Sequence, residues 1–559
     1  MSPSRRWAPG RWAFGRWAPC AWAALWVALI AAVWVTRPLL PIDETRYASV
    51  AWEMWRKADW LLPRVNGQPY PDKPPLLFWL VLIGWKVFGV HAWVLRLVPA
   101  LFALGAVYLS ARLAGELWPE RPEVGQTAGW IVLGSVAWVL YGTVVLFDML
   151  MACFTLLALL GLLRAWRRGG PRPWGLVGLA LGLGLLAKGP VIFIYVLPAA
   201  LATPWWGGPR RQPKGRYYPG LLTATLLGLA IVLAWAVPAA HAGGPRYAAA
   251  IFWGQTAGRM ANSFAHRRPI WWYLALLPIV TAPWSLSPRV WRGARALPGI
   301  LAERGVRLCL IWFVGGLALF SLISGKQLHY LIPLFPALAL LMARVASPEP
   351  GERRRWDALP AAAFLLLIGI LLLAFPRVMR VATRVGVAPP RWALTVGGVT
   401  SIALGLVLLA LVVALLIAAV PRGLAGRRQS AALSTATVLT MIALHLGIMR
   451  PAAAAYDLGP AARVIARLQA EGRPVANVGR YHAEFQFLGR LREPVAEIPS
   501  SDARRWAASH PDGALVTYPD QWPLRAPAAL TFAQAYENGA LVIQGSREAL
   551  AGGIGRPPR

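Results

Sequence analysis

Long apolar runs separated by short polar segments make up most of the first 450 residues. A helix that spans a bilayer needs about 20 mostly apolar residues. Runs of roughly this kind lie at 20–36, 93–114, 125–147, 149–165, 174–188, 190–206, 220–240, 271–287, 308–324, 328–345, 358–375, 394–420 and 433–449. They predict about thirteen transmembrane helices.

A shorter apolar run, Leu76–Gly89, has about fourteen residues, and this length is typical of an interfacial or re-entrant helix. Charge supports that interpretation. If this run does not cross, one side of the membrane holds the basic N-terminal arm and the arginine-rich segments 164–172, 207–218, 288–307, 350–356 and 421–428. The positive-inside rule makes that side the cytoplasm. The basic stretch 377–391 then lies on the outer side, and it is the one loop that does not follow the positive-inside rule.

From about Arg450 the chain gains Asp, Glu, Gln and Asn and loses its long apolar runs. Short apolar stretches at 474–478, 514–517 and 540–544 predict strands, and 459–469 predicts a helix. The predicted organisation therefore ends in a small soluble α/β domain. Its parts are a cytoplasmic arm (1–19), a transmembrane domain (20–449) with periplasmic loops at 37–92 and 241–270, and a periplasmic domain (450–559).

The first apolar run is also compatible with a signal peptide, because a basic segment precedes residues 21–35. We favour a retained anchor, since no convincing A-x-A cleavage site follows and a charged segment comes directly after the run. The predicted protein is thus a multi-pass integral membrane protein.

Composition agrees with a polytopic membrane protein. Of the 559 residues 57% are hydrophobic and 14% are charged, and the net charge is +34. In a polar chain such an excess of Lys and Arg would suggest nucleic acid, but a mean hydropathy of +0.51 argues against that class. Cys20, Cys153 and Cys309 form no CxxC pattern, so neither a disulfide framework nor a zinc ribbon is expected.

Ionisable and polar side chains at the outer ends of the apolar runs are the candidate functional residues, because charges at membrane depth are costly unless paired. They are Asp43, Arg46, Tyr47, Asp72, Lys73, Asp148, Lys188, His266, Lys326 and Tyr330. In the predicted topology all of them face the periplasm. Each also has a structural explanation: the acids can stabilise helix N-termini and the lysines can snorkel. Lys326 and Tyr330 are spaced i, i+4, which predicts one shared helix face.

These residue types suit group transfer from a phosphate. A carboxylate can act as general base towards an acceptor hydroxyl or orient an ionised acceptor. Lys, Arg and Tyr can hold a phosphate and stabilise it as a leaving group. ATP is absent outside the cytoplasm and the chain has no P-loop or dinucleotide-binding fingerprint, so an activated lipid-linked group is the expected donor.

Seven blocks resemble one family in the family's order. They are DETRY (43–47), ADWLLPRVNGQPYPDKPPLLFWL (58–80), LRLVPAL (95–101), FDMLMACF (147–154), LLAKGP (185–190), HRRPIWWY (266–273) and SGKQLHYLIPLFPALALL (324–341). They resemble the bacterial 4-amino-4-deoxy-L-arabinose lipid A transferases, within the protein O-mannosyltransferase-like GT-C glycosyltransferases. The resemblance covers residues 20–345, while the last spans and the tail agree only in layout.

The resemblance implies an inverting transfer of a sugar from a polyprenyl-phosphate carrier to lipid A or another envelope acceptor. It makes Asp43 the catalytic aspartate and Asp148 the second acid of the cavity. The donor and its phosphate would be bound by Arg46, Tyr47, Lys73, Lys188, Lys326 and Tyr330. No cofactor is required, although some relatives place a metal between an acidic residue and a loop histidine, here Asp72 and His266. Asp72 is one methylene shorter than the family's usual Glu.

The residues leave two other functions open. One is a protein O-mannosyltransferase of the same fold. The other is a transporter or flippase of lipid-linked sugars, which would suit Pro- and Gly-interrupted spans with intramembrane charges. The polar residues cluster on one side and the sequence shows no internal repeat, and both observations favour the glycosyltransferase.

Overall fold

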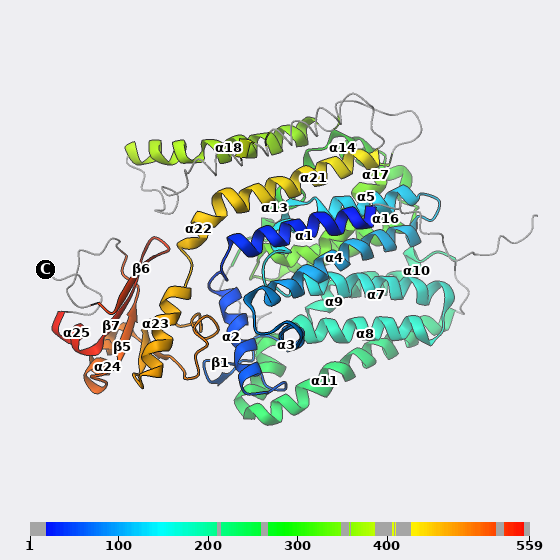
Figure 1. The fold of residues 1–559 in the computed structure, drawn as a ribbon. Helices are drawn as coiled ribbons and strands as arrows, with labels where there is room; N and C mark the ends of the chain where they lie inside the picture. The colour runs from blue at the N-terminus through cyan, green and yellow to red at the C-terminus, as the bar shows by residue number, and fades with distance from the viewer. Residues whose placement is uncertain are drawn as a thin grey trace, which may run out of the picture.

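The structure is a computed structural model, and it describes residues 18–209, 214–258, 267–347, 357, 359–385, 405–406, 409, 426–520 and 530–552. A bundle of helices carries a small α/β unit at one end (Figure 1). Most of the predicted arm and most of the predicted span at 394–420 lie outside the described residues, and so does His266.

Seven helical segments of the described residues are long and apolar enough to cross a membrane. They are α1 (Ala18–Thr36), α4 (Ala92–Leu117), α7 (Asp148–Arg168), the run Tyr217–Gly254 that contains α11 (Tyr217–Ala249), α16 (Arg304–Leu322), the run Leu328–Val345 that ends in α17 (Phe335–Val345), and the run Gln429–Ala470 that begins within α21 (Gly426–Leu444). The bent helix α18 (Leu359–Arg384) makes an eighth if its two halves form one span. The polytopic helical fold is confirmed, while the count of about thirteen stays a prediction.

Shorter helices fill the space between these segments. They are α2 (Asp43–Arg56), α3 (Leu76–Phe88), α5 (Pro122–Leu133), α6 (Val136–Tyr141), α8 (Pro171–Lys188), α9 (Val191–Leu201), α10 (Thr203–Trp206), α13 (Trp272–Val280), α14 (Pro288–Arg295) and α15 (Leu297–Ile300). Three apolar runs that the sequence predicts as continuous spans are broken, at Gly134, Ala202 and Thr281. Pro204 and Pro283 follow the second and third breaks, and proline cannot continue a helix hydrogen-bond ladder.

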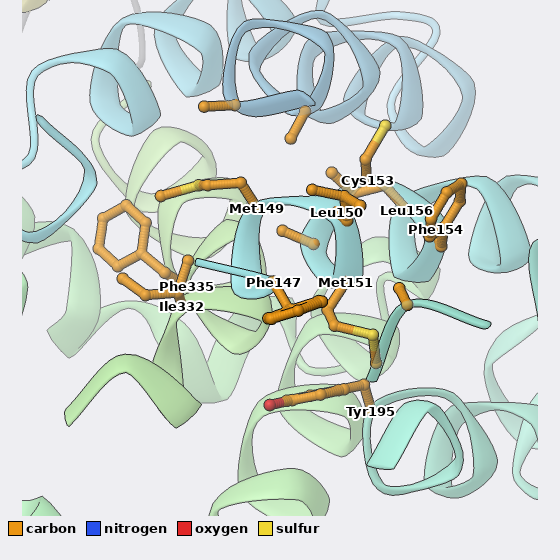
Figure 2. Close-up of a cluster of buried hydrophobic side chains, with 14 of the residues drawn as sticks. Phe147, Met149, Leu150, Met151, Cys153, Phe154, Leu156, Tyr195, Ile332 and Phe335 are labelled. Atoms are coloured by element: carbon orange, nitrogen blue, oxygen red, sulfur yellow. The ribbon is translucent and has the colours of Figure 1, made fainter. Parts of the chain in front are cut away.

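Helix α7 lies at the centre of the bundle and is the most buried of the seven segments. Figure 2 shows its first turns, with Met149, Leu150 and Met151, surrounded by Tyr195 of α9 and by Ile332 and Phe335. This packed apolar surface fixes the N-terminal end of α7, where Asp148 begins the helix.

Helix α2 is tied to the bundle through one buried carboxylate. Glu44 accepts hydrogen bonds from Nη2 of Arg37 at 3.3 Å and from Nε and Nη2 of Arg96 at 3.2 and 2.7 Å. The backbone amides of Leu40 and Val145 also donate to it, at 2.9 and 3.0 Å. The carboxylate therefore joins the outer ends of α1 and α4 to the turn that leads into α7.

The C-terminal unit is a mixed five-stranded sheet with three helices. Its strands are β3 (Val475–Val478), β4 (Ala496–Ile498), β5 (Ala514–Thr517), β6 (Phe532–Tyr536) and β7 (Gly539–Gly545), in the order β4-β3-β5-β7-β6. β3 pairs in parallel with β4 and β5, whereas β7 pairs antiparallel with β5 and β6. The helices are α23 (Gly459–Ala470), α24 (Ala503–Ser509) and α25 (Ser546–Gly552). Alternate core positions such as Leu541 and Ile543 pack against α23 residues.

A hairpin in the first loop docks on this unit. Strands β1 (Arg64–Val65) and β2 (Gln68–Pro69) are joined by Asn66-Gly67, both with positive φ, as a two-residue hairpin turn requires. The Asn66 side chain donates to the carbonyl of Val495 at 2.8 Å and accepts from its amide at 2.9 Å. Nε2 of Gln486 also donates to Asn66, at 2.6 Å. The C-terminal unit thus holds the loop that carries Lys73.

Replacing Glu44 with Gln should destabilise the protein, because Arg37 and Arg96 would lose their charge partner while staying buried. Breaking a buried pair in this way costs about 3–5 kcal/mol. The free energy of unfolding in mixed micelles measures the effect. Glu471→Gln is the matched control, because Glu471 is exposed and its pair with Arg473 is 3.9 Å long; we expect less than about 1 kcal/mol there. Equal losses of unfolding free energy in the two variants would contradict the structural role given to Glu44.

The same carboxylate predicts acid sensitivity. Burial alone would raise the pKa of Glu44, but Arg96 and Arg37 lower it to about 2 from the usual 4.5. A depressed pKa contributes stability above pH 4.5 that is lost as the pH falls towards 2, here about 3 kcal/mol. The stability difference between the wild type and Glu44→Gln should therefore shrink over that range. A difference that is constant with pH would contradict the account.

Candidate active site

The first part of the site is an ion pair between two neighbouring helices. Asp148 is the first residue of α7 and Lys188 is the last residue of α8. The Lys188 Nζ lies 2.6 Å from Oδ1 of Asp148, and both side chains are buried. An acid at a helix N-terminus and a base at a C-terminus are each favoured by the helix dipole. Gly169 and Gly170, both with positive φ, form the tight turn that makes α7 and α8 antiparallel neighbours.

Two ring side chains complete this part. The Lys188 Nζ lies 4.8 Å from the ring centroid of Tyr330, and the rings of His329 and Tyr330 pack edge to face at 4.8 Å. Nε2 of His329 is 3.9 Å from Oδ2 of Asp148. This oxygen is buried and accepts no hydrogen bond from the described residues.

The second part of the site lies at the start of α2. The guanidinium of Arg46 donates to Oδ1 of Asp43 at 2.5 Å, one helical turn away. It also lies 5.6 Å from the ring centroid of Tyr47, whose ring packs edge to face on Phe147 at 5.1 Å. Lys73 Nζ is 5.6 Å from that Phe147 ring. Asp43 is 51% exposed, so it is the accessible carboxylate of the site.

The two parts form one site. Phe147, which contacts Tyr47 and Lys73, directly precedes Asp148 in the chain. The charges of Asp43 and Lys73, as well as those of Asp148 and Lys188, act on His329. The structure therefore brings together seven of the ten predicted residues: Asp43, Arg46, Tyr47, Lys73, Asp148, Lys188 and Tyr330.

Lys326 has a different environment from the one its spacing predicts. The helical turn begins at Leu328, so Lys326 precedes it and shares no helix face with Tyr330. Its Nζ donates to the carbonyls of Ile323 at 2.6 Å and Arg268 at 3.1 Å, and the residue is buried. Lys326 holds two loop segments together, and its role towards a phosphate stays a prediction.

The metal site suggested by the resemblance stays a prediction. Asp72 lies in the turn before Lys73, and His266 falls outside the described residues. Within the part of the chain that is described, no three His, Cys, Asp or Glu side chains gather closely enough to hold a metal ion.

The sequence did not predict that the C-terminal unit contacts the helix that carries Asp43 and Arg46. The Ser49 hydroxyl, on α2 beyond Arg46, donates to the carbonyl of Ala483 at 2.7 Å and accepts from the Phe487 amide at 3.2 Å. The flanking residues His482 and Glu484 thereby lie near the start of α2. Burial lowers the pKa of His482, and Arg46 lowers it further. No local sequence signal connects segments separated by more than 400 residues.

The chemistry of the site follows from these contacts. Burial raises the pKa of Tyr47 well above its usual value, so its hydroxyl is a neutral donor. Arg46, Lys73 and Lys188 can stabilise an anion, and the accessible Asp43 can face a hydroxyl. One site thus combines a base with cations suited to a phosphate leaving group.

Comparisons with known proteins identify relatives of the chain. A sequence model of the family described as "Dolichyl-phosphate-mannose-protein mannosyltransferase" matches residues 72–237. A protein from Sodalis glossinidius (strain morsitans) is 33% identical over 396 residues, which cover 64% of this chain and 67% of that protein. It is named undecaprenyl phosphate-alpha-4-amino-4-deoxy-L-arabinose arabinosyl transferase 1. The chain belongs to this aminoarabinose transferase-like GT-C family.

Other curated relatives of this family member carry the same name. The relative from Pseudomonas savastanoi pv. phaseolicola (strain 1448A / Race 6) is 30% identical over 374 residues, 62% of this chain and 67% of that protein. For Pseudomonas fluorescens (strain Pf0-1) the identity is 30% over 345 residues, 59% of this chain and 56% of that protein. The match thus spans between 56% and 67% of the length of these relatives.

The fold of the chain is similar to that of a solved protein over nearly the full length of both. The crystal structure of ArnT from Cupriavidus metallidurans in the apo state superposes with a TM-score of 0.72 at 20% identity, and covers 95% of this chain and 99% of that chain. The structure of the same protein bound to undecaprenyl phosphate gives 0.71 at 19% identity, with 94% and 97% covered.

Removing the ammonium of Lys188 tests the ion pair. Lys188→Met leaves Asp148 charged and buried without its partner, so we expect a loss of about 3–5 kcal/mol in the free energy of unfolding. The double variant Asp148→Asn/Lys188→Met removes both charges and should recover part of this loss. Unfolding in mixed micelles measures both. A double variant that is less stable than Lys188→Met would contradict the pairing.

Proposed function

We propose that the protein is an inverting glycosyltransferase that moves an aminoarabinose-like or other sugar from a polyprenyl-phosphate carrier to lipid A or another cell-envelope acceptor. The observation that carries the proposal is the accessible Asp43–Arg46 pair beside Lys73 and the buried Asp148–Lys188 pair. The names of the relatives support a lipid-phosphate-linked donor. The similar ArnT structure, which holds bound undecaprenyl phosphate, supports the same class of donor.

Each side chain has a role in this reaction. Asp43 takes the proton of the acceptor hydroxyl, or orients an acceptor that is already ionised, while that oxygen attacks the anomeric carbon. The bond from this carbon to the phosphate oxygen breaks, and the carrier phosphate leaves with the electron pair. Arg46, Lys73 and Lys188 stabilise the charge that develops on it, with Tyr330 beside Lys188. Attack opposite the leaving group inverts the configuration.

The topology that we propose places this site at the periplasmic face of the bacterial inner membrane. The arm would then lie in the cytoplasm and the C-terminal unit in the periplasm, with about thirteen spans. The C-terminal unit is hydrogen-bonded to the first loop, and this contact supports a location of both on the same side of the membrane. Transfer measured with a chelator and after restoring divalent ions tests a metal at Asp72 and His266.

Replacing the catalytic carboxylate separates chemistry from binding. Asp43→Asn removes the base, so we expect transfer to fall by about 10²–10⁴-fold with donor affinity largely unchanged. Purified protein with a labelled polyprenyl-phosphate sugar measures both quantities. The matched control is Asp59→Asn in the same loop, because Asp59 accepts from the amides of Leu61 and Leu62 and an asparagine can keep these bonds. Retained turnover in Asp43→Asn would contradict the role.

A second function has one observation in its favour, the match of residues 72–237 to the protein mannosyltransferase family. Mass spectra of lipid A and of periplasmic proteins, with and without the gene, separate the two acceptors. We expect a sugar mass on lipid A that disappears without the gene. Loss of hexose from proteins with unchanged lipid A would favour protein mannosylation. Movement of intact donor across vesicles without cleavage would favour a flippase.

A further inference from the structure

A cavity lies outside the site just described. It has a volume of about 420 Å³ and opens at the junction of α1, α4 and α22 (Arg450–Ala454). Its lining includes Trp34, Arg37, Trp93, Arg96, Arg450 and Asp457. Figure 1 shows α22 beside the end of α1 and close to the start of α2. Arg37 and Arg96 of this lining are bound to Glu44, the residue that follows Asp43 in the chain.

The polar lining favours an anion. Three arginines, from α1's end, α4 and α22, line the cavity, against Asp457 and the neighbouring Glu44. The set therefore keeps one net positive charge. Nε of Arg37 is buried and has no hydrogen-bond partner among the described residues, and the Arg37 side chain is only 7% exposed.

The backbone adds to this preference. Ala92 and Trp93 are the first residues of α4, which is 26 residues long and has no side-chain cap. Uncapped amides at the start of a long helix attract anions. The carbonyls of Arg37 and Pro38 already accept from the Arg96 guanidinium, at 2.6 and 2.5 Å. These two acceptors are thus satisfied, while the Nε donor of Arg37 has no partner among the described residues.

The apolar lining indicates that the anion belongs to a lipid. Trp34 and Trp93 pack with ring centroids 5.3 Å apart, and such indole pairs are typical of the head-group level of a bilayer. Val35 lines the same cavity and is 74% exposed on α1, a predicted spanning helix. The cavity therefore opens towards the lipid-facing surface.

We propose that this cavity binds the phosphate of a membrane lipid in the outer leaflet, through Arg450, Arg37 and the first turn of α4. The phosphate can come from a bilayer phospholipid or from the phosphorylated head group of an acceptor glycolipid. Binding does not depend on the proposed function. Because Glu44 binds Arg37 and directly follows Asp43, one ion pair connects the lining of the cavity to the start of α2.

Native mass spectrometry of the purified full chain tests the proposal with three probes: phosphatidylglycerol, hexa-acylated lipid A and phosphate-free digalactosyl diacylglycerol. Arg450→Gln removes an exposed guanidinium for which the described residues offer no hydrogen bond, so the fold should be unaffected. We expect its affinity for a phosphate-bearing lipid to fall about tenfold, the effect of one charge-assisted hydrogen bond. Arg450→Lys keeps the charge, so its affinity should lie between that of the wild type and that of Arg450→Gln.

The control is Arg467→Gln, an exposed arginine near the far end of α23, which should bind like the wild type. If Arg450→Gln binds phosphatidylglycerol more weakly than the wild type does, the ligand is a bilayer lipid. If only its binding of lipid A is weakened, the ligand is an acceptor head group. Unchanged binding in Arg450→Gln, or equal binding of the phosphate-free lipid, would overturn the proposal. Binding of phosphatidylglycerol needs no sugar transfer, so failure of the transferase assignment leaves this result distinct.

Discussion

The arrangement depends on the buried carboxylate of Glu44. Two guanidinium groups from α1's end and from α4 converge on it, and the amide of Val145 ties it to the turn before α7. A carboxylate without these partners would be costly at this depth, because burial penalises its charge. The pairing therefore places α2 against the bundle in one orientation. Asp43 is the adjacent residue in the chain, so the contact that anchors α2 also aims the candidate base.

A second constraint acts on α2 and on the rest of the first loop, and it comes from the C-terminal unit. Ser49 and Asn66 are hydrogen-bonded to the C-terminal unit, and Trp85 of α3 stacks on Phe487 at 5.4 Å. The first loop is thus held from both sides, by an ionic cluster in the bundle and by neutral hydrogen bonds above it. Rigid support of this kind keeps an exposed carboxylate and its cations in fixed relative positions, which electrostatic stabilisation of a leaving group requires.

Apolar runs and rare charges predicted much of this structure. α4 and α7 lie where their runs are, and three strands of the C-terminal unit lie at the predicted apolar stretches. Asp148 and Lys188 stood out because each is a charge at the end of an apolar run. Breaks at Ala202 and Thr281 were missed, because hydropathy does not weigh proline. The contact of Ser49 with Ala483 was out of reach, since it joins segments whose pairing depends on tertiary packing.

The central claim is that the sugar–phosphate bond is cleaved at the Asp43 site by direct displacement. The most direct test uses a polyprenyl-phosphate sugar labelled with ¹³C at the anomeric carbon, incubated with the purified protein and an acceptor lipid. Nuclear magnetic resonance of the product reports the configuration at that carbon. The account predicts a glycolipid with inverted configuration and release of one polyprenyl phosphate per sugar transferred. Retained configuration, or a donor that stays intact, would contradict it.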